Sequence, residues 1–211
     1  MAQSLAWLGR SPGRYSPVQI ARLHKFTSML LEENGQQNLI ASATVPFLWS
    51  RHILDSAQLV DLVPRGTSGE WVDLGTGAGF PGMICAILCP DLPFTLVEER
   101  RKRADWLKKA MNANGLENTT VHHGRLSTLA RRNAAIISAR AFASLPDTLA
   151  QASHIATPET WWLLPKGKSA AEELAQMGEQ GAMFHVEHSC TNDNAGIIVG
   201  RTTMIDTGAL R

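Results

Sequence analysis

The segment "WVDLGTGAGFPG", residues 71–82, decides the fold of this chain of 211 residues. A short apolar run ends at Asp73, and a loop with four glycines follows it, at Gly75, Gly77, Gly79 and Gly82. Each glycine costs roughly 0.5–1 kcal/mol relative to alanine, so four in so short a loop indicate that a ligand approaches the backbone. Because a helix is predicted directly after the loop, free backbone N–H groups gather at its N-terminus, which is typical of a nucleotide or nucleoside site.

From residue 70 onward, short apolar runs alternate with segments of helical periodicity. The runs predicted as strands are 70–75, 94–99, 119–124, 134–142 and 160–167. This alternation favours a mostly parallel, doubly wound α/β sheet with helices on both faces. Residues 182–190 and 195–205 are expected to add a closing antiparallel pair.

Two helices are predicted ahead of this alternation. Residues 16–35 carry apolar side chains at helical spacing, with Ser16 as the N-cap. A second helix is expected over residues 46–63. We therefore predict an N-terminal helical extension over residues 1–66, packed on a core domain over residues 67–211.

Charge and composition narrow the class of protein. Twenty basic and nineteen acidic residues give a net charge of +1, so any nucleic acid must be bound by a basic patch rather than by the charge of the whole chain. No run approaches the ~18 apolar residues of a membrane span, and the three cysteines fit reduced thiols, so we expect a soluble, cytoplasmic protein. No metal site is expected, because the spacing of Cys85, Cys89 and Cys190 matches no closed zinc pattern.

Two classes of cofactor compete for the glycine loop. The string "GAGFPG" at 77–82 satisfies the dinucleotide pattern G-x-G-x-x-G, and Glu98 lies 21 residues after Gly77, where an acid accepts hydrogen bonds from the ribose of NAD. The longer string "VDLGTGAG" at 72–79 instead fits the pattern acid-x-Gly-x-Gly-x-Gly, in which the loop cradles the methionine part of S-adenosylmethionine. Asp73, which lies on the strand itself, favours S-adenosylmethionine over NAD.

Five segments together resemble one bacterial family. They are "RHILDS" (51–56), "VDLGTGAGFPG" (72–82), "LVEERRKRADWL" (96–107), "SARAFASL" (138–145) and "LLPKGK" (163–168). In their order and spacing the chain is similar, over roughly residues 16–205, to the ribosomal RNA small subunit methyltransferase G family, also called glucose-inhibited division protein B. The resemblance implies a class I, Rossmann-like methyltransferase fold. It also implies transfer of a methyl group from S-adenosylmethionine to N7 of a guanine in small-subunit (16S) rRNA, near the decoding site.

The resemblance and the strand ends together define a predicted cofactor site. Its residues are Asp73, Gly75, Gly77, Gly79, Phe80, Glu98, Leu126, Ser127 and Arg140. Glu98 ends the second strand, where its carboxylate would accept hydrogen bonds from both ribose hydroxyls, and Phe80 would line the pocket. Family members often carry an acid two residues after Arg125, where this chain has Ser127. We therefore expect backbone groups around Leu126 to bind the adenine.

Basic residues at strand ends are the predicted contacts to the RNA backbone. They are Arg125, Arg140 and Lys166. Arg140 follows the fourth strand, where its guanidinium would hold either the cofactor's carboxylate or an RNA phosphate by paired hydrogen bonds. A basic run over residues 100–109 reads either as a solvated helix face or as part of an RNA footprint. The expected partner is small-subunit rRNA, naked or within a ribosomal particle, bound by a monomer.

No residue is predicted to act as a general base. Guanine N7 carries a lone pair and no proton, so the protein need only align it with the methyl–sulfur bond. The chain has "SARAF" where enzymes that methylate exocyclic amines commonly carry an Asn- or Asp-Pro-Pro-aromatic segment, and Cys85 and Cys89 read as buried helix positions. His52 is expected to order the N-terminal helices. Two alternatives stay open: a methyltransferase acting on another RNA, a protein or a small molecule, and a nicotinamide-binding oxidoreductase or noncatalytic nucleotide-binding module.

Overall fold

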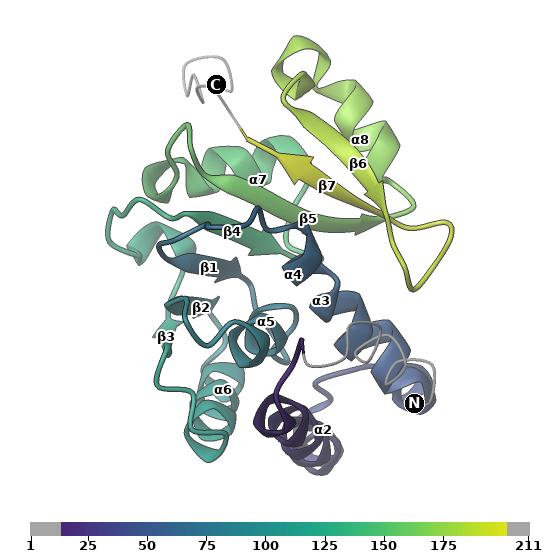
Figure 1. Cartoon of the computed structure of the whole chain (residues 1–211), viewed down its shortest axis with the longest axis vertical. Coiled ribbons are helices and arrows are strands. Elements are labelled where there is room, and N and C mark those ends of the chain that lie inside the picture. The colour runs from purple at the N-terminus through teal and green to yellow at the C-terminus, as the bar shows by residue number, and fades with distance from the viewer. Residues whose placement is uncertain (1–13, 202–211) are drawn as a thin grey trace.

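The computed structural model, which describes residues 14–201, contains one seven-stranded sheet (Figure 1). The strands are β1 (Trp71–Leu74), β2 (Phe94–Glu98), β3 (Thr119–His123), β4 (Ile136–Ala139), β5 (Trp161–Gly167), β6 (Phe184–His188) and β7 (Gly196–Gly200). Their order is β3-β2-β1-β4-β5-β7-β6; β1 to β5 are parallel, and β7 is antiparallel to β5 and β6. All seven predicted strands are confirmed. Residues 202–205 of the last prediction lie outside the described part of the chain.

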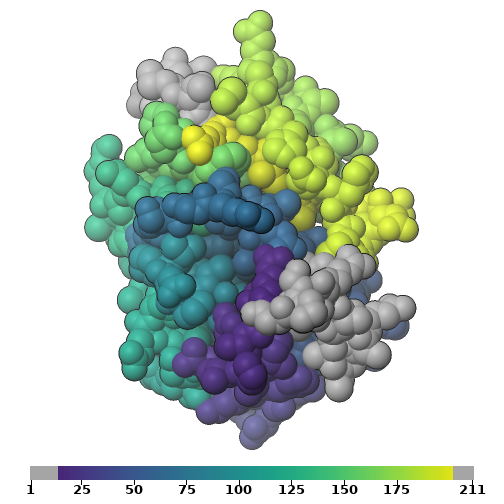
Figure 2. All heavy atoms as spheres, in the orientation of Figure 1, coloured from purple at the N-terminus to yellow at the C-terminus, as the bar shows by residue number. Residues whose placement is uncertain are grey.

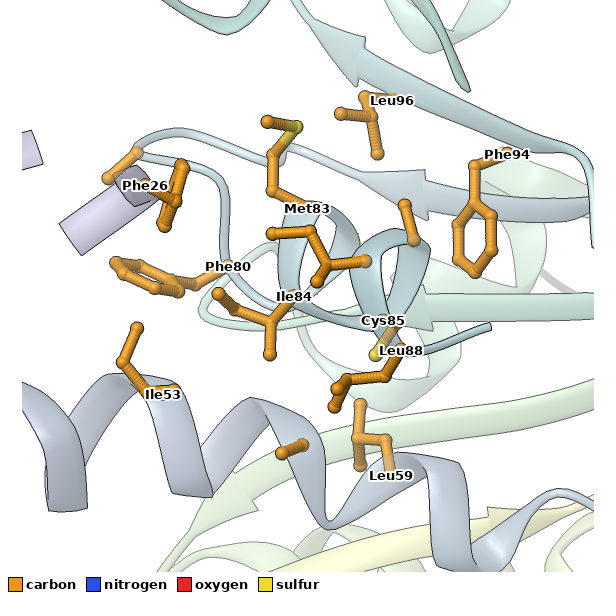
Figure 3. Packing of buried hydrophobic residues seen from close by; sticks show 14 of the residues in the cluster. Phe26, Ile53, Leu59, Phe80, Met83, Ile84, Cys85, Leu88, Phe94 and Leu96 are labelled. Carbon is orange, nitrogen blue, oxygen red and sulfur yellow. The ribbon is translucent and has the colours of Figure 1, made fainter. Parts of the chain in front are cut away.

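Helices cover both faces of this sheet, as predicted. Beyond the extension they are α5 (Gly82–Leu88), α6 (Arg101–Ala113), α7 (Leu145–Ala152) and α8 (Ala170–Gln176), with short 3₁₀ turns η3 (Leu126–Thr128), η4 (Ser153–Ile155) and η5 (Gly178–Gly181). On one face, α5 and α6 pack in a cluster that includes Trp71 and Leu96. Figure 3 shows Leu96 of this cluster close to Met83 of α5. On the other face, α7 and α8 pack over Val72 and Val97. Neighbouring residues of β1 and β2 thus alternate between two hydrophobic layers, as buried parallel strands do.

The first part of the extension is the helix predicted from residue 16. Helix α2 spans Pro17–Gln37, and Ser16 and Gln19 form a reciprocal capping box at its start. Phe26 and Leu30 are fully buried against the core. Figure 2 shows α2, in purple, beside the teal residues of α6 in the lower half of the molecule, and the two helices are in contact.

The single helix predicted over residues 46–63 is wrong. The chain instead forms a 3₁₀ turn η1 (Ser42–Phe47), a π-helical turn η2 (Trp49–Leu54) and two short helices, α3 (Asp55–Ala57) and α4 (Leu59–Leu62). Pro46 lies inside η1 rather than in the first turn of an α-helix. The π-helical turn and the residue after it bring His52 and Asp55 to Arg140, at the end of β4.

The extension and the core share one hydrophobic cluster. Phe26 of α2 and Ile53 of η2 pack with Phe80 and Met83, which follow the glycine loop (Figure 3). The division predicted at residue 66 falls between α4 and β1 and stays an interpretation, because the two parts are packed together on one face of the sheet. Within residues 14–201, no helix combines the length and apolar character needed to cross a membrane.

Candidate functional site

The glycine loop leaves β1 in a conformation that glycine adopts readily. Gly75, Gly77 and Gly79 have φ angles of +63°, +60° and +114°. A Cβ atom added to Gly75 would lie 2.9 Å from the ring of Phe142, and one added to Gly79 would lie 2.8 Å from the ring of Phe26. At Gly77 the nearest atom would be 3.6 Å away, in ordinary contact. Gly75 and Gly79 are therefore required by close packing within the protein, whereas a Cβ atom at Gly77 would make only ordinary contacts.

Asp73 anchors the glycine loop through buried hydrogen bonds. Its side chain is fully buried, and Oδ2 accepts a hydrogen bond from the backbone N–H of Gly82, at the start of α5, at 3.0 Å. Oδ1 accepts from the hydroxyl of Ser138 on β4 at 2.6 Å, and Ser138 accepts in turn from Trp71 Nε1 at 2.8 Å. Burial raises the pKa of Asp73 from its ordinary value of 3.8 to about 6. The carboxylate thus joins β1, β4 and α5, and a direct contact between Asp73 and a cofactor stays a prediction.

Glu98 joins the glycine loop to the end of β2. Its Oε2 accepts from the backbone N–H of Gly77 at 2.9 Å, and its Oε1 accepts from the N–H of Arg100 at 2.7 Å. Only 5% of the residue is exposed. The structure therefore brings Glu98 to the loop, at the carboxyl edge of the sheet where ligands of doubly wound folds bind. Hydrogen bonds from Glu98 to ribose hydroxyls stay a prediction.

A cavity of about 300 Å³ opens between the glycine loop and the ends of β2 and β3. We call it the glycine-loop cavity, and its lining residues are Gly75, Val97, Glu98, Glu99, Gly124, Arg125, Leu126, Ser127, Phe142 and Gln151. Four residues predicted to bind the cofactor therefore share one cavity. Arg125, predicted to bind RNA, lies at the same cavity and is exposed, 3.9 Å from Glu99.

Arg140 is held at the end of β4 by the extension. Its Nη1 is 3.3 Å from Asp55 Oδ2 and 3.4 Å from the carbonyl oxygen of Arg51, and its Nη2 donates to His52 Nδ1 at 3.1 Å. The guanidinium lies 5.1 Å from the ring centroid of Phe80, and the His52 ring stacks on Phe80 at 5.0 Å. Phe80, predicted to line the cofactor pocket, is thus a buried platform beneath Arg140 and His52.

His52 is fixed in one neutral form. Because an arginine can only donate, Nδ1 of His52 must accept, and the ring proton lies on Nε2, 3.0 Å from Thr44 Oγ1. Burial, with the positive charges of Arg140 and Arg51, lowers the pKa of His52 to about 4. A neutral acceptor facing a guanidinium is suited to orienting Arg140. We expected His52 to order the N-terminal helices; in the structure it also contacts Arg140, at the end of β4.

Lys166 occupies the same sheet edge but has partners within the protein. Its ammonium group lies 2.9 Å from Glu173 Oε2 and also donates to the carbonyl of Ala143, and the side chain is only 8% exposed. These contacts tie the end of β5 to the segment after β4. A contact between Lys166 and RNA stays a prediction.

Cys85 is a buried position of α5, as the sequence predicted, whereas Cys89 is the C-cap of that helix. Cys85 is buried, and burial raises the pKa of its thiol well above the ordinary value. Cys89 is half-buried, with a pKa raised to about 11. Both thiols are therefore protonated at neutral pH and poorly suited to nucleophilic attack. Among residues 14–201, no group of three or more histidine, cysteine or acidic side chains is arranged to hold a metal ion.

Comparison with known proteins assigns the chain to a family. The sequence profile of the GidB family, rRNA small subunit methyltransferase G, matches residues 19–196. This chain belongs to that family. A relative from Novosphingobium aromaticivorans, named ribosomal RNA small subunit methyltransferase G, is 48% identical over 202 residues, covering 94% of this chain and 87% of the relative. A relative of the same name from Erythrobacter litoralis is 47% identical over 189 residues, covering 89% and 91%.

Solved structures give the fold class of this member of the rRNA small subunit methyltransferase G family. A SAM-dependent methyltransferase from Aquifex aeolicus superposes with a TM-score of 0.55 at 15% identity, over 75% of this chain and 94% of that one. At this identity the likeness shows the fold alone. The fold is the class I, Rossmann-like methyltransferase fold, as predicted.

Sequence reasoning missed several residues at the site of this methyltransferase G family member. Phe142 and Gln151 line the glycine-loop cavity, and Asp55 is the acidic partner of Arg140. Phe142 belongs to the "SARAF" string, so its place two residues after Arg140 was a usable signal. Gln151 carried no such signal, because a polar residue on a surface helix resembles any other solvated position.

Proposed function

We propose that this chain transfers a methyl group from S-adenosylmethionine to N7 of one guanine in small-subunit (16S) rRNA. The observation that carries the proposal is family membership, which extends over residues 19–196 and includes relatives of 48% and 47% identity. The glycine loop, Glu98 and the class I fold supply the matching cofactor site. The alternatives of an NAD-dependent oxidoreductase and of a noncatalytic module have no comparable support.

The residues of the glycine-loop cavity fit S-adenosylmethionine. Gly75 brings bare backbone to the cavity beside the proposed methionine part, and Glu98 offers carboxylate oxygens to a ribose diol. Leu126 and Ser127 lie after β3, where backbone groups can face adenine. When bound, the cofactor supplies a methyl group on a positively charged sulfur. The chain's own part is to hold that group at the carboxyl edge of β1 and β4.

Methylation of guanine N7 requires little acid–base catalysis from the protein. The N7 lone pair forms the new bond to carbon while the carbon–sulfur bond breaks, and the positive charge moves to the guanine ring. No proton leaves in this step, so positioning and electrostatics supply the catalysis. Arg140, clamped on Phe80 by His52 and Asp55, is the group we assign to positioning at the junction of cofactor and substrate.

The proposed RNA contacts are spread along one sheet edge and one helix. Arg125 is exposed beside the glycine-loop cavity, whereas Arg140 and Lys166 order the segments after β4 and β5. Helix α6 adds exposed charges from Arg101, Lys102, Lys108 and Lys109. Because phosphate contacts release counterions, RNA binding should weaken as salt rises while cofactor binding persists.

The setting of the reaction is part of the proposal. We infer that the chain acts in the cytoplasm, where its proposed rRNA substrate is found, and as a monomer. Its RNA is naked rRNA or rRNA within a ribosomal particle.

The proposal is tested in cells. Small-subunit rRNA from cells that have or lack this protein is digested to nucleosides and measured by mass spectrometry. We expect one N7-methylguanine per rRNA molecule to be lost in the deletion strain and restored by the intact gene, but not by a Gly77→Val variant. Unchanged N7-methylguanine in the deletion strain would refute the proposal.

A further inference from the structure

A second cavity, of about 630 Å³, lies over the other half of the sheet's carboxyl edge. We call it the β6–β7 cavity, because the connection between β6 and β7 forms one of its walls, through residues 189–195. The segment that contains Thr44, Arg51, His52 and Asp55 forms a facing wall, and Arg140 and the end of β5 complete it. Its volume falls within the roughly 300–1,000 Å³ of small-molecule sites.

Hydrogen bonds hold the two walls together. Thr191 Oγ1 donates to Asp55 Oδ1 at 2.9 Å, and the backbone N–H of Cys190 donates to Gln58 Oε1 at 2.8 Å. Gln58 Nε2 in turn donates to Ser189 Oγ at 3.2 Å. Residues more than 130 positions apart in sequence are therefore tied side by side, and Figure 1 shows the β6–β7 connection on the same side of the molecule as α3. The cavity has fixed walls, one of which includes a π-helical turn of the kind often found at functional sites.

The two cavities flank the middle of the sheet. The glycine-loop cavity takes residues from the ends of β2 and β3, whereas the β6–β7 cavity takes residues from the ends of β4 and β5 and the start of β7. Arg140 lines the second cavity and Phe142, two residues later, lines the first. In the sheet order, β1 lies between these two groups of strands. The two cavities therefore lie on either side of the end of β1.

The lining of the β6–β7 cavity matches the chemistry of a guanine nucleotide. The edge of guanine presents acceptors at O6 and N7 and donors at N1 and N2. Arg51 and Arg140 carry guanidinium donors, Asp55 carries a carboxylate, and Asn192 and Asn194 carry amides that both donate and accept. A base can reach such a site only after it leaves its stack, which a single-stranded RNA loop permits at low cost.

We propose that the β6–β7 cavity is the subsite that receives the unstacked target guanine nucleotide. The proposal rests on the proposed function, because it places the acceptor of that same methyl transfer. It also explains why the extension is tied to the C-terminal hairpin. The extension supplies one wall of the substrate site as well as a cover for α5 and α6.

Cys190 offers a chemical probe of this cavity. It is exposed and lines the cavity, whereas Cys85 is buried and Cys89 is half-buried with a raised pKa. N-ethylmaleimide should therefore modify Cys190 before the other two thiols. The bulky adduct would occupy the proposed nucleotide space, and we expect an approximately 100-fold loss of rRNA methylation from displacement of the base. The affinity for S-adenosylmethionine, measured by calorimetry, should not change.

Protection of Cys190 by bound rRNA is an independent test of the guanine subsite. Unmethylated small-subunit rRNA at about ten times its dissociation constant should slow the modification of Cys190 about tenfold, and S-adenosylmethionine alone should not slow it. A Cys190→Ser variant should resist the reagent, so its rate of rRNA methylation should be the same before and after treatment. The matched control adds Gln180→Cys to Cys190→Ser, since Gln180 is exposed on η5, outside both cavities, and its modification should leave activity intact.

The outcomes separate the two proposals. Full activity after modification of Cys190, or a labelling rate that rRNA does not change, would overturn the guanine subsite while unmodified protein still methylates rRNA. Equal inhibition of the Gln180→Cys control would overturn it as well. Unmodified protein that binds S-adenosylmethionine but leaves rRNA without N7-methylguanine would overturn the proposed function, and the subsite with it.

Discussion

Replacing Asp73 by asparagine should change how the stability of the protein depends on pH. Asp73 is fully buried, and its pKa is raised from 3.8 to about 6. The folded protein therefore binds the Asp73 proton more tightly than the unfolded chain does. Protonation of Asp73 therefore contributes to the free energy of unfolding. This contribution is fully present below about pH 4 and is lost as the pH rises through 6. A change of about 2 in pKa, at about 1.4 kcal/mol for each unit, corresponds to about 3 kcal/mol.

The measurement compares wild type with Asp73→Asn by urea unfolding at pH 4, 5, 6 and 7. The free energy of unfolding of wild type should fall by about 2–2.5 kcal/mol relative to the variant across this range, because asparagine does not titrate and part of the full contribution is already lost at pH 4. The variant also alters the hydrogen bonds from Gly82 and Ser138, which shifts the difference by a constant. Other titrating groups are common to both proteins. The difference between the two profiles is therefore the test, and parallel profiles, or wild type gaining stability relative to the variant as pH rises, would refute the reasoning.

Three further substitutions test the site. Glu98→Ala should weaken S-adenosylmethionine binding by about 1–3 kcal/mol in calorimetry, because acceptors for the ribose hydroxyls are lost. Gly77→Val should abolish this binding, since its side chain enters the cofactor space and the φ of +60° disfavours a branched residue. His52→Leu should lower kcat/KM for rRNA about tenfold by removing the acceptor that orients Arg140, and His52→Asn, which keeps an acceptor near the Nδ1 position, should retain most activity.

Each of these predictions has a result that contradicts it. An unchanged dissociation constant in folded Glu98→Ala would limit Glu98 to its hydrogen bonds with the backbone of Gly77 and Arg100. Normal cofactor binding by Gly77→Val would mean that the methionine part lies elsewhere. Equal activity of His52→Leu and His52→Asn, with equal melting temperatures, would remove His52 from the positioning of Arg140. Adding His52→Leu to Arg140→Ala should cost little further activity if the two residues act as one unit.

The strands were predictable because parallel strands buried on both faces read as short apolar runs. All four residues of β1 and all five of β2 are buried, so their sequence signal is local and strong. The helix predicted over residues 46–63 failed for the opposite reason. Apolar spacing does not distinguish an α-helix from consecutive 3₁₀, π and α turns, and the π-helical turn there is accompanied by contacts to Arg140, far away in sequence.

The cofactor site was predictable to the extent that its contacts are local. The glycine loop and Glu98 lie on adjacent strands, and the rule that ligands bind at the carboxyl edge of parallel strands brings them together. The internal role of Asp73 was not visible, because it depends on Ser138, 65 residues away. The contacts that hold Arg140 could not be predicted from the sequence either, because His52 and Asp55 lie 88 and 85 positions from it. The sequence named Arg140 without showing what holds it.

The most direct test of the account uses purified protein and small-subunit rRNA from cells that lack it. The RNA is incubated with S-adenosylmethionine carrying a labelled methyl group, then treated with borohydride and aniline, which cleave the chain at N7-methylguanine because its ring is cationic. We predict one new cleavage site, at a guanine, that needs both protein and cofactor and weakens as salt rises. Label on cytosine, on an adenine amine or on protein, with the RNA uncleaved, would contradict the N7-guanine assignment.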